Sequence, residues 1–337
     1  MIRSVAALCL AAMCIAAQPP KIGDINLYGL RRLSADRLLK GAGVESGGTL
    51  PPSKGDLEER LEAVPGVVAA RVEALCCEGS NVTVFIGIEE RGGPHFETRT
   101  APSGNAVLPE DLVADYREFL GAVERAASRG SAAEDYTSGE ARTDDPAARL
   151  FEERFRAFAA ENLNLLRDVL RNGSEAEQRA VAATVIGYAP KKDQALNDLQ
   201  YALQDADESV RANAVRSLKA IAVLAQKRPE LELKVSPTWF VEMLNSLVLN
   251  DKLRSAEALL ILTNQPNPGA LDLVRERALP ALIEMARWKT LRYALPAFLL
   301  VGRIAEIPDA DLQAQWQKGD RETALKKAMA APPKTRK

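Results

Sequence analysis

The stretch LQYALQDADESVRANAVRSL, residues 199–218, decides the fold of the larger part of the chain. Its second half resembles an earlier segment. An arginine, an alanine three residues later and an aliphatic residue four residues after that begin at Arg179 and again at Arg211, with looser copies at Arg254 and Arg292. These arginines are 32, 43 and 38 residues apart. Each period accommodates two helices and their turns, so the sequence predicts a helical repeat array.

We expect this array to fill residues 147–330. The region has no strand pattern of any length, and Asp145-Pro146 is a favoured sequence for a helix start. The quoted stretch resembles a HEAT-like repeat, through the pattern Leu199-x-x-Ala202-Leu203-x-Asp205-x-Asp207-x-x-Val210-Arg211-x-x-Ala214-Val215-x-x-Leu218.

The resemblance implies an all-α HEAT-like solenoid and assigns roles to three residues. Asp207 is expected to cap the second helix, Val210 to pack inside, and Arg211 to reach across the interface between repeats. Such solenoids are usually protein-binding scaffolds whose concave face is the working surface. Some relatives are chromophore lyases. An enzyme with a carboxylate site on the concave face therefore stays open as an alternative.

Residues 22–91 predict a small α+β module in the order β-α-α-β-β. Apolar residues alternate near both ends of this segment, which indicates strands. Between them, Ser34 can cap one helix, and Leu57, Leu61 and Val64 lie on one face of a second helix.

This module resembles a POTRA domain. The matching residues are Ile25-x-Leu27-x-Gly29-Leu30, Leu57-x-x-x-Leu61, Val64-Pro65-Gly66-Val67, Ala70-x-Val72 and Val82-x-Val84-x-Ile86-x-Ile88-Glu89-Glu90-Arg91. The resemblance implies work in the cell envelope, where family members often bind partners by adding a strand to an exposed sheet edge. The strand at 69–75 is then the candidate edge. Its outward Arg71 and Glu73 become candidate partner-binding residues.

Residues 92–146 are expected to be a linker with one helix, from about residue 109 to residue 129. Residues 130–146 are polar, which predicts a solvated segment between the two domains. Their acidic residues lack the spacing of a calcium-binding loop. Residues 331–337 are predicted to be a frayed basic tail.

Residues 1–17 have the pattern of an export signal. Arg3 precedes an apolar run from Val5 to Ala17 that ends in small residues. The run is too short to span a membrane as a helix, and no later segment is apolar enough to do so. The sequence therefore predicts an exported protein of the periplasm or cell envelope, with envelope proteins as its partners.

Cysteine and histidine usage limits the chemistry. Once the predicted signal is removed, Cys76 and Cys77 remain, adjacent in sequence. Inert thiols, a vicinal disulfide, and redox or metal chemistry all stay open for this pair, although it lacks the spacing of a CxxC motif. The single histidine, His95, excludes a multi-histidine metal site. We predict no metal and no cofactor.

The charge balance and one tryptophan bear on which partners the protein binds. The 44 basic residues balance 46 acidic ones, which argues against nucleic-acid binding. Trp288 lies in a segment dense in large residues, either as core packing or as a partner-binding hot spot. We take it as a candidate partner-binding residue. The expected function is a non-enzymatic adaptor or assembly scaffold.

Overall fold

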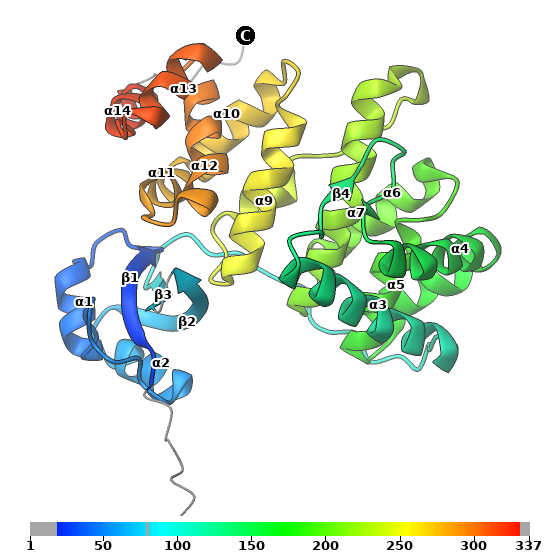
Figure 1. The fold of residues 1–337 in the computed structure, drawn as a ribbon, viewed down its shortest axis with the longest axis horizontal. Coiled ribbons are helices and arrows are strands. Elements are labelled where there is room, and N and C mark those ends of the chain that lie inside the picture. Colours follow the sequence, from blue (N-terminus) through cyan, green and yellow to red (C-terminus); the bar gives the residue numbers. More distant parts are fainter. Residues whose placement is uncertain (1–18, 79–80, 331–337) are drawn as a thin grey trace, which may run out of the picture.

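The computed structural model describes residues 19–78 and 81–330. The predicted export signal and the predicted tail lie outside the described residues. A small sheet-containing region is followed by a large region of stacked helices (Figure 1). In chain order the elements are β1 (Lys21–Tyr28), α1 (Ala35–Ala42), α2 (Lys54–Glu62), β2 (Val67–Glu78), β3 (Asn81–Glu90), α3 (Glu110–Ser128), β4 (Glu134–Asp135), β5 (Arg142–Thr143), α4 (Pro146–Asn172), α5 (Ala176–Ile186), α6 (Lys192–Ala202), α7 (Glu208–Lys227), η1 (Pro229–Leu231), α8 (Thr238–Met243), α9 (Leu249–Leu262), α10 (Pro268–Arg277), α11 (Leu279–Arg287), α12 (Leu291–Ile304), α13 (Asp309–Gln317) and α14 (Glu322–Ala330).

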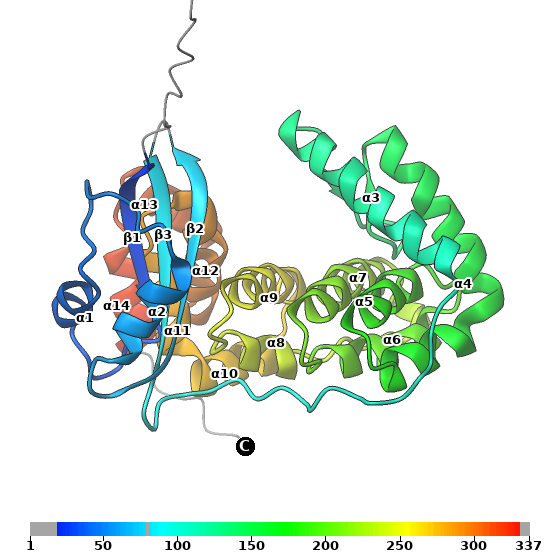
Figure 2. The same ribbon diagram turned by 90° about the horizontal axis from the view of Figure 1, so that it is seen from below.

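The N-terminal region is a three-stranded sheet in the order β1-β3-β2. Strand β1 runs parallel to β3, and β2 runs antiparallel to it. Helices α1 and α2 lie on one face of the sheet, and the helical region lies on the other (Figure 2). Leu38, Leu57 and Leu61 from the two helices are buried in one core with Val84 and Ile86 of β3. Both faces of this small sheet are therefore covered.

Local sequence signals set the ends of these elements. The Ser34 side chain accepts a hydrogen bond from the backbone N–H of Arg37 at the start of α1, at 3.4 Å. At the end of β1 the backbone of Gly29 has a φ of 84°, and a Cβ there would lie 2.0 Å from the carbonyl oxygen of Ile88. Only glycine fits this turn, which directs the chain away from the sheet towards α1.

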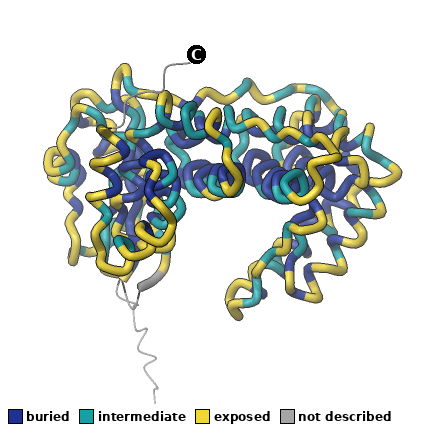
Figure 3. The backbone as a smooth tube through the Cα atoms, turned by 90° about the horizontal axis from the view of Figure 1, so that it is seen from above, coloured by how far each residue is buried: buried dark blue, intermediate teal, exposed yellow. Residues whose placement is uncertain are grey.

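The helical region is a stack of helices in two rows. Helices α5, α7 and α9 form the inner row and pack against one another in sequence, while α6, α8 and α10 lie on the outer side (Figure 2). Buried residues run continuously through the stack (Figure 3). Ala182 of α5 and Ala214 of α7 are fully buried. Small side chains at these positions allow neighbouring helices to approach closely.

The sheet and α3 both project from the inner side of this stack (Figure 2). Strand β2 bounds the concave surface at one end, and α3 bounds it at the other. Helices α7 and α9 lie between them. The concave surface is therefore enclosed on two sides by parts of the chain that precede the repeats in sequence.

The prediction of a solvated linker at 130–146 is wrong. Strands β4 and β5 form a hairpin that is bound to α7, and α3 packs on α4 and α5. Glu140 and Asp145 are buried in the segment because each binds an arginine, Arg156 and Arg129 respectively. Ion pairing within the fold, rather than solvation, accounts for the polar composition.

Residues 92–109, here called the strap, cross the outer side of the stack in extended form (Figure 2). The backbone N–H of Arg99 donates to the carbonyl oxygen of Gln204 at 2.8 Å, and Gly104 forms a β-bridge with Gly173. Phe96 is buried. The strap is therefore fixed to two successive repeats and does not loop freely.

Candidate interaction surface

A buried arginine joins the first pair of repeats. The guanidinium of Arg179, on α5, donates to both carboxylate oxygens of Asp205 at 2.9 and 2.8 Å. It also donates to the carbonyl oxygens of Gly173 and Ser174. The pKa of Arg179 is raised, chiefly by its hydrogen bond with Asp205. A charged, bidentate pair of this kind fixes both the distance and the orientation of two elements.

Arg211 repeats this arrangement one step along the stack. Its guanidinium pairs with Asp251 at the start of α9, at 2.7 Å, and donates to the carbonyl oxygens of Asp205 and Ala206. Asp207 caps α7 by accepting from two backbone N–H groups, and Val210 is fully buried. The structure places all three residues singled out from the sequence in one turn between repeats.

Arg179 and Arg211, here called the arginine ladder, have no arginine counterpart in α9. Arg179 and Arg211 are each the fourth residue of their helices, and the fourth residue of α9 is Lys252. The alignment of Arg254 with Arg179 and Arg211 in the sequence is therefore wrong by two residues. Arg254 donates to Asn250 of its own helix at 2.9 Å and to no other residue in the described part of the chain. The same positional count, applied to the sequence, would have identified Lys252.

The N-terminal sheet docks on the stack beside Lys252. The ring of Trp288, which follows α11, packs edge-on against Tyr28 of β1 and Phe85 of β3, with ring centroids 5.9 and 5.1 Å apart. Trp288 is 3% exposed. Its prediction as a binding residue for another protein is therefore wrong, because its partner is the chain's own sheet. Apolar burial of this ring drives the docking.

Polar groups surround this junction. The carboxylate of Glu284 accepts from the backbone N–H of Gly29 at 3.0 Å and from Arg31 at 2.5 Å. Burial raises the pKa of Glu284, and this effect outweighs the opposing charge of Arg31. Burial lowers the pKa of Lys252 to about 8. Its ammonium donates to the carbonyl oxygen of Leu244 and lies 5.1 Å from the centroid of the Tyr28 ring.

The outer edge of β2 is partly covered, which corrects the prediction of an open edge at 69–75. The backbone N–H of Ala70 donates to Glu62 at 3.0 Å, and that of Val72 donates to Glu58 at 2.7 Å, both on α2. Since alternate residues of an antiparallel strand face the same side, the N–H groups of residues 71 and 73 point towards β3. Strand addition at the first half of β2 is therefore blocked.

The candidate residues Arg71 and Glu73 of β2 contact the helical region and α2. Arg71 pairs with Glu208, at the start of α7, at 3.3 Å. Glu73 pairs with Lys54 of α2 at 2.9 Å. Each side chain remains about one-third exposed, at 38% and 33%. They therefore occupy the rim of the concave surface, where β2 meets the stack.

A cleft of about 300 Å³ lies beside these residues. Its apolar wall includes Leu75 of β2, Leu253 of α9 and Tyr293 of α12, and its rim carries Glu73 and Glu208. The complete lining is Glu73, Leu75, Glu208, Val248, Leu249, Asn250, Leu253 and Tyr293. An apolar cleft with a charged rim is the usual arrangement of a site that anchors one large side chain of a partner.

A cluster of two carboxylates, Glu134 of the hairpin and Glu152 of α4, surrounds one arginine of α7. Arg216 of α7 pairs with Glu134 and with Glu152, and Glu152 is fully buried. Burial would raise the pKa of Glu134, but Arg216 outweighs it and the pKa is lowered. Arg216 thus favours the ionised form of Glu134, and its ion pairs with Glu134 and Glu152 form a structural contact that fixes the hairpin on α7. In residues 19–78 and 81–330 no group of three metal-ligating side chains comes together.

Cys76 forms a disulfide and its side chain is exposed. The side chain of Cys77 is outside the part of the structure that is described. Pairing of the two adjacent cysteines therefore stays a prediction.

Comparison with known proteins locates the repeats. Residues 163–233 match the family model of HEAT repeats. The matched segment begins within α4 and ends beyond α7, so it contains the Arg179 and Arg211 contacts. A search of curated proteins found no relative. Over the described residues, no helix is both long and apolar enough to cross a membrane.

Proposed function

We propose that the protein is a non-enzymatic adaptor that holds a partner protein on its concave surface. The observation that carries this proposal is the cleft between β2 and α9, at the point where a HEAT-like stack meets the sheet. HEAT repeats commonly bind other proteins through their concave face. Here the partner would also contact β2.

The sheet region supports a second part of the proposal, that it acts as a POTRA-like module. Its elements follow in the order β1, α1, α2, β2 and β3, with both helices on one face. Because Glu58 and Glu62 occupy the first half of the β2 edge, strand addition would use the second half, from Ala74 onwards. Ala74 is exposed. An extended segment there would place a side chain in the cleft beside Leu75.

The proposed compartment is the periplasm or cell envelope, with an envelope protein as partner. This rests on the sequence of residues 1–17 and on the resemblance of residues 22–91 to envelope modules.

Site-specific crosslinking of the full chain tests the binding site. A photoreactive amino acid replaces Leu75 in the cleft or, as the control, Leu150, which is 66% exposed on α4. We expect a crosslinked envelope protein from the Leu75 position alone. Adding Leu253→Glu, which places a charge in the apolar wall, should remove that product. Equal products at both positions, or a product that survives Leu253→Glu, would refute the concave site.

A further inference from the structure

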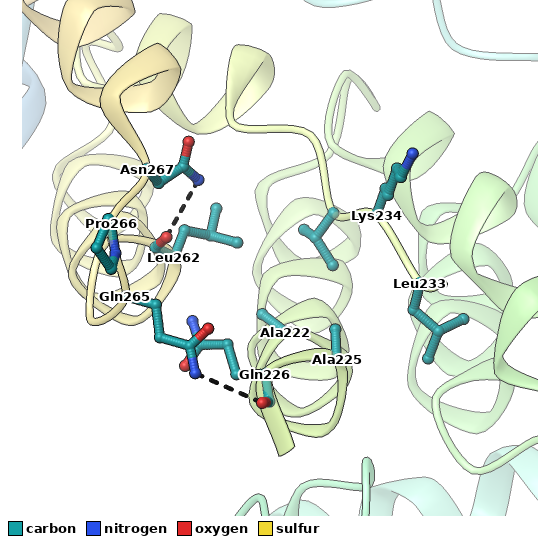
Figure 4. A pocket seen from close by; sticks show the side chains of 10 residues that line it. Ala222, Ala225, Gln226, Leu233, Lys234, Leu262, Gln265, Pro266 and Asn267 are labelled. Atoms are coloured by element: carbon teal, nitrogen blue, oxygen red, sulfur yellow. Dashed lines mark hydrogen bonds between the residues drawn. The ribbon is translucent and has the colours of Figure 1, made fainter. Parts of the chain in front are cut away.

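A second groove lies away from the concave surface, between the last turns of α7 and α9. It measures about 280 Å³ (Figure 4). Residues 233–235, which connect η1 to α8, form its third side. No residue of this groove lines the cleft beside β2, so its function would be separate from that of the concave surface.

The walls of the groove suit a large apolar side chain. Helix α7 contributes Ala222 and Ala225, whose small side chains leave the space open. Leu262, Pro266 and Val235 supply apolar surface on the other sides. A leucine or phenylalanine from a partner would remove apolar surface from water here, which favours binding.

The groove also presents unused hydrogen-bonding groups. Residues 233–235 belong to no helix or strand, and within the described chain their backbone N–H and C=O groups form no hydrogen bond. Gln226 and Gln265 each donate their amide N–H to a carbonyl oxygen, of Ile261 and Gln226 respectively. Among residues 19–78 and 81–330, no group donates to their side-chain oxygens. Main-chain groups of an extended peptide match this arrangement, since they alternate donor and acceptor as a neighbouring strand does.

Charge selects among such peptides. Lys234 is the one charged side chain in the lining of the groove; it is exposed and forms no ion pair in the described structure. No carboxylate lines the groove. A peptide that carries an acidic residue near its apolar residue complements this charge, whereas a basic peptide would be repelled.

We propose that this groove binds an extended peptide segment in which an apolar anchor residue stands next to an acidic residue. The anchor lies between the two alanines of α7 and Leu262 of α9. The peptide backbone pairs with residues 233–235, and its carboxylate faces Lys234.

Selection from a displayed library of random peptides, with the full chain as bait, tests this proposal. We expect an enriched sequence that pairs an acidic with a large apolar residue, and the synthetic peptide should bind in a fluorescence anisotropy titration. Ala225→Trp fills the groove at a partly exposed position and should abolish binding. Lys234→Glu should weaken binding about tenfold, because it replaces an attractive pair with a repulsive one.

Lys227→Glu is the matched control. Lys227 is also exposed and lies at the end of α7, but it does not line the groove. This variant should change the affinity by less than about twofold. The proposal is overturned if no sequence is enriched, if Ala225→Trp binds the selected peptide normally, or if both lysine variants weaken binding equally.

Discussion

The repeat interface at Arg211 and the one that follows at Lys252 occupy the same position in successive repeats and are built differently. Arg211 is bound to Asp251 in the next repeat, so it joins two neighbours. Lys252 forms no ion pair with any residue that the structure describes and instead lies beside the Tyr28 ring of the sheet. The HEAT-like ladder ends where the N-terminal region docks. At Lys252 a contact with a distant part of the chain takes the place of the ion pair that Arg211 makes with the next repeat.

The largest expected effect on the difference between the two interfaces comes from removing Arg211. Arg211→Ala leaves the buried Asp251 carboxylate with only the Ser246 hydroxyl as a side-chain donor. We expect the free energy of unfolding to fall by about 4 kcal/mol, the usual cost of leaving a buried charge unpaired. Urea denaturation measures it. Arg254→Ala is the control, and its loss should stay below about 1 kcal/mol. Equal losses would mean that the ladder position has been assigned wrongly.

Removing Trp288 tests the other side of the comparison. Trp288→Ala should lower the free energy of unfolding by about 3 kcal/mol, because a buried ring is lost from the junction. It should also make the strap more susceptible to limited proteolysis, since the sheet no longer holds it at one end. Trp316→Ala removes a ring that packs on Phe298, with centroids 5.2 Å apart. That control should leave cleavage of the strap unchanged.

The pH dependence of the free energy of unfolding should show that Lys252, unlike Arg211, can lose its proton in the folded chain. Its pKa is about 8 in the folded chain and 10.5 ordinarily, so above pH 8 the unfolded chain binds more protons than the folded one. Stability contributed by this group therefore rises with pH, by about 2 kcal/mol between pH 7.5 and 9.5. Lys252→Met should remove this rise. Lys192, whose pKa burial also lowers to about 8, is present in both proteins and cancels in the difference. Identical pH profiles would show that Lys252 is solvated.

The helix caps provide the smallest test. Asp207→Ala removes an acceptor for two backbone N–H groups of α7 and should cost about 1 kcal/mol. Glu175 precedes α5 at the corresponding position but forms no capping bond. Glu175→Ala should leave the denaturation midpoint unchanged. A loss at Glu175 as large as that at Asp207 would show that neither effect comes from capping.

Residues that belong to one helix and the turn before it could be predicted from the sequence. Asp207, Val210 and Arg211 are only a few positions apart, and their roles follow from helix geometry and from a HEAT-like pattern. The hairpin could not be predicted in this way. Glu140 and Asp145 have the composition of a solvated segment, and only the arginines that bind them, at different distances along the chain, make them buried residues.

The contact between the sheet and the stack could not be predicted either, because its residues are far apart in the sequence. Trp288 is bound to β1 across 261 residues of sequence, through a hydrogen bond from its indole N–H to the carbonyl oxygen of Leu27. The residues around Trp288 in the sequence show only that it is large and apolar. They do not indicate whether it packs on another protein or on a strand near the start of the same chain.

The docking of the sheet on α9, α11 and α12 also changes how the chain can fold. Repeat stacks in general gain stability one neighbour at a time, and their ends can open independently. Here β1, near the beginning, contacts α11, near the end, so the chain closes on itself: the sheet, the strap and the stack together form one long loop. Closing a loop of this length costs chain entropy that local contacts do not recover. The docking of the sheet therefore waits for nearly the whole chain to form, and the first domain and the last helices become a single cooperative unit.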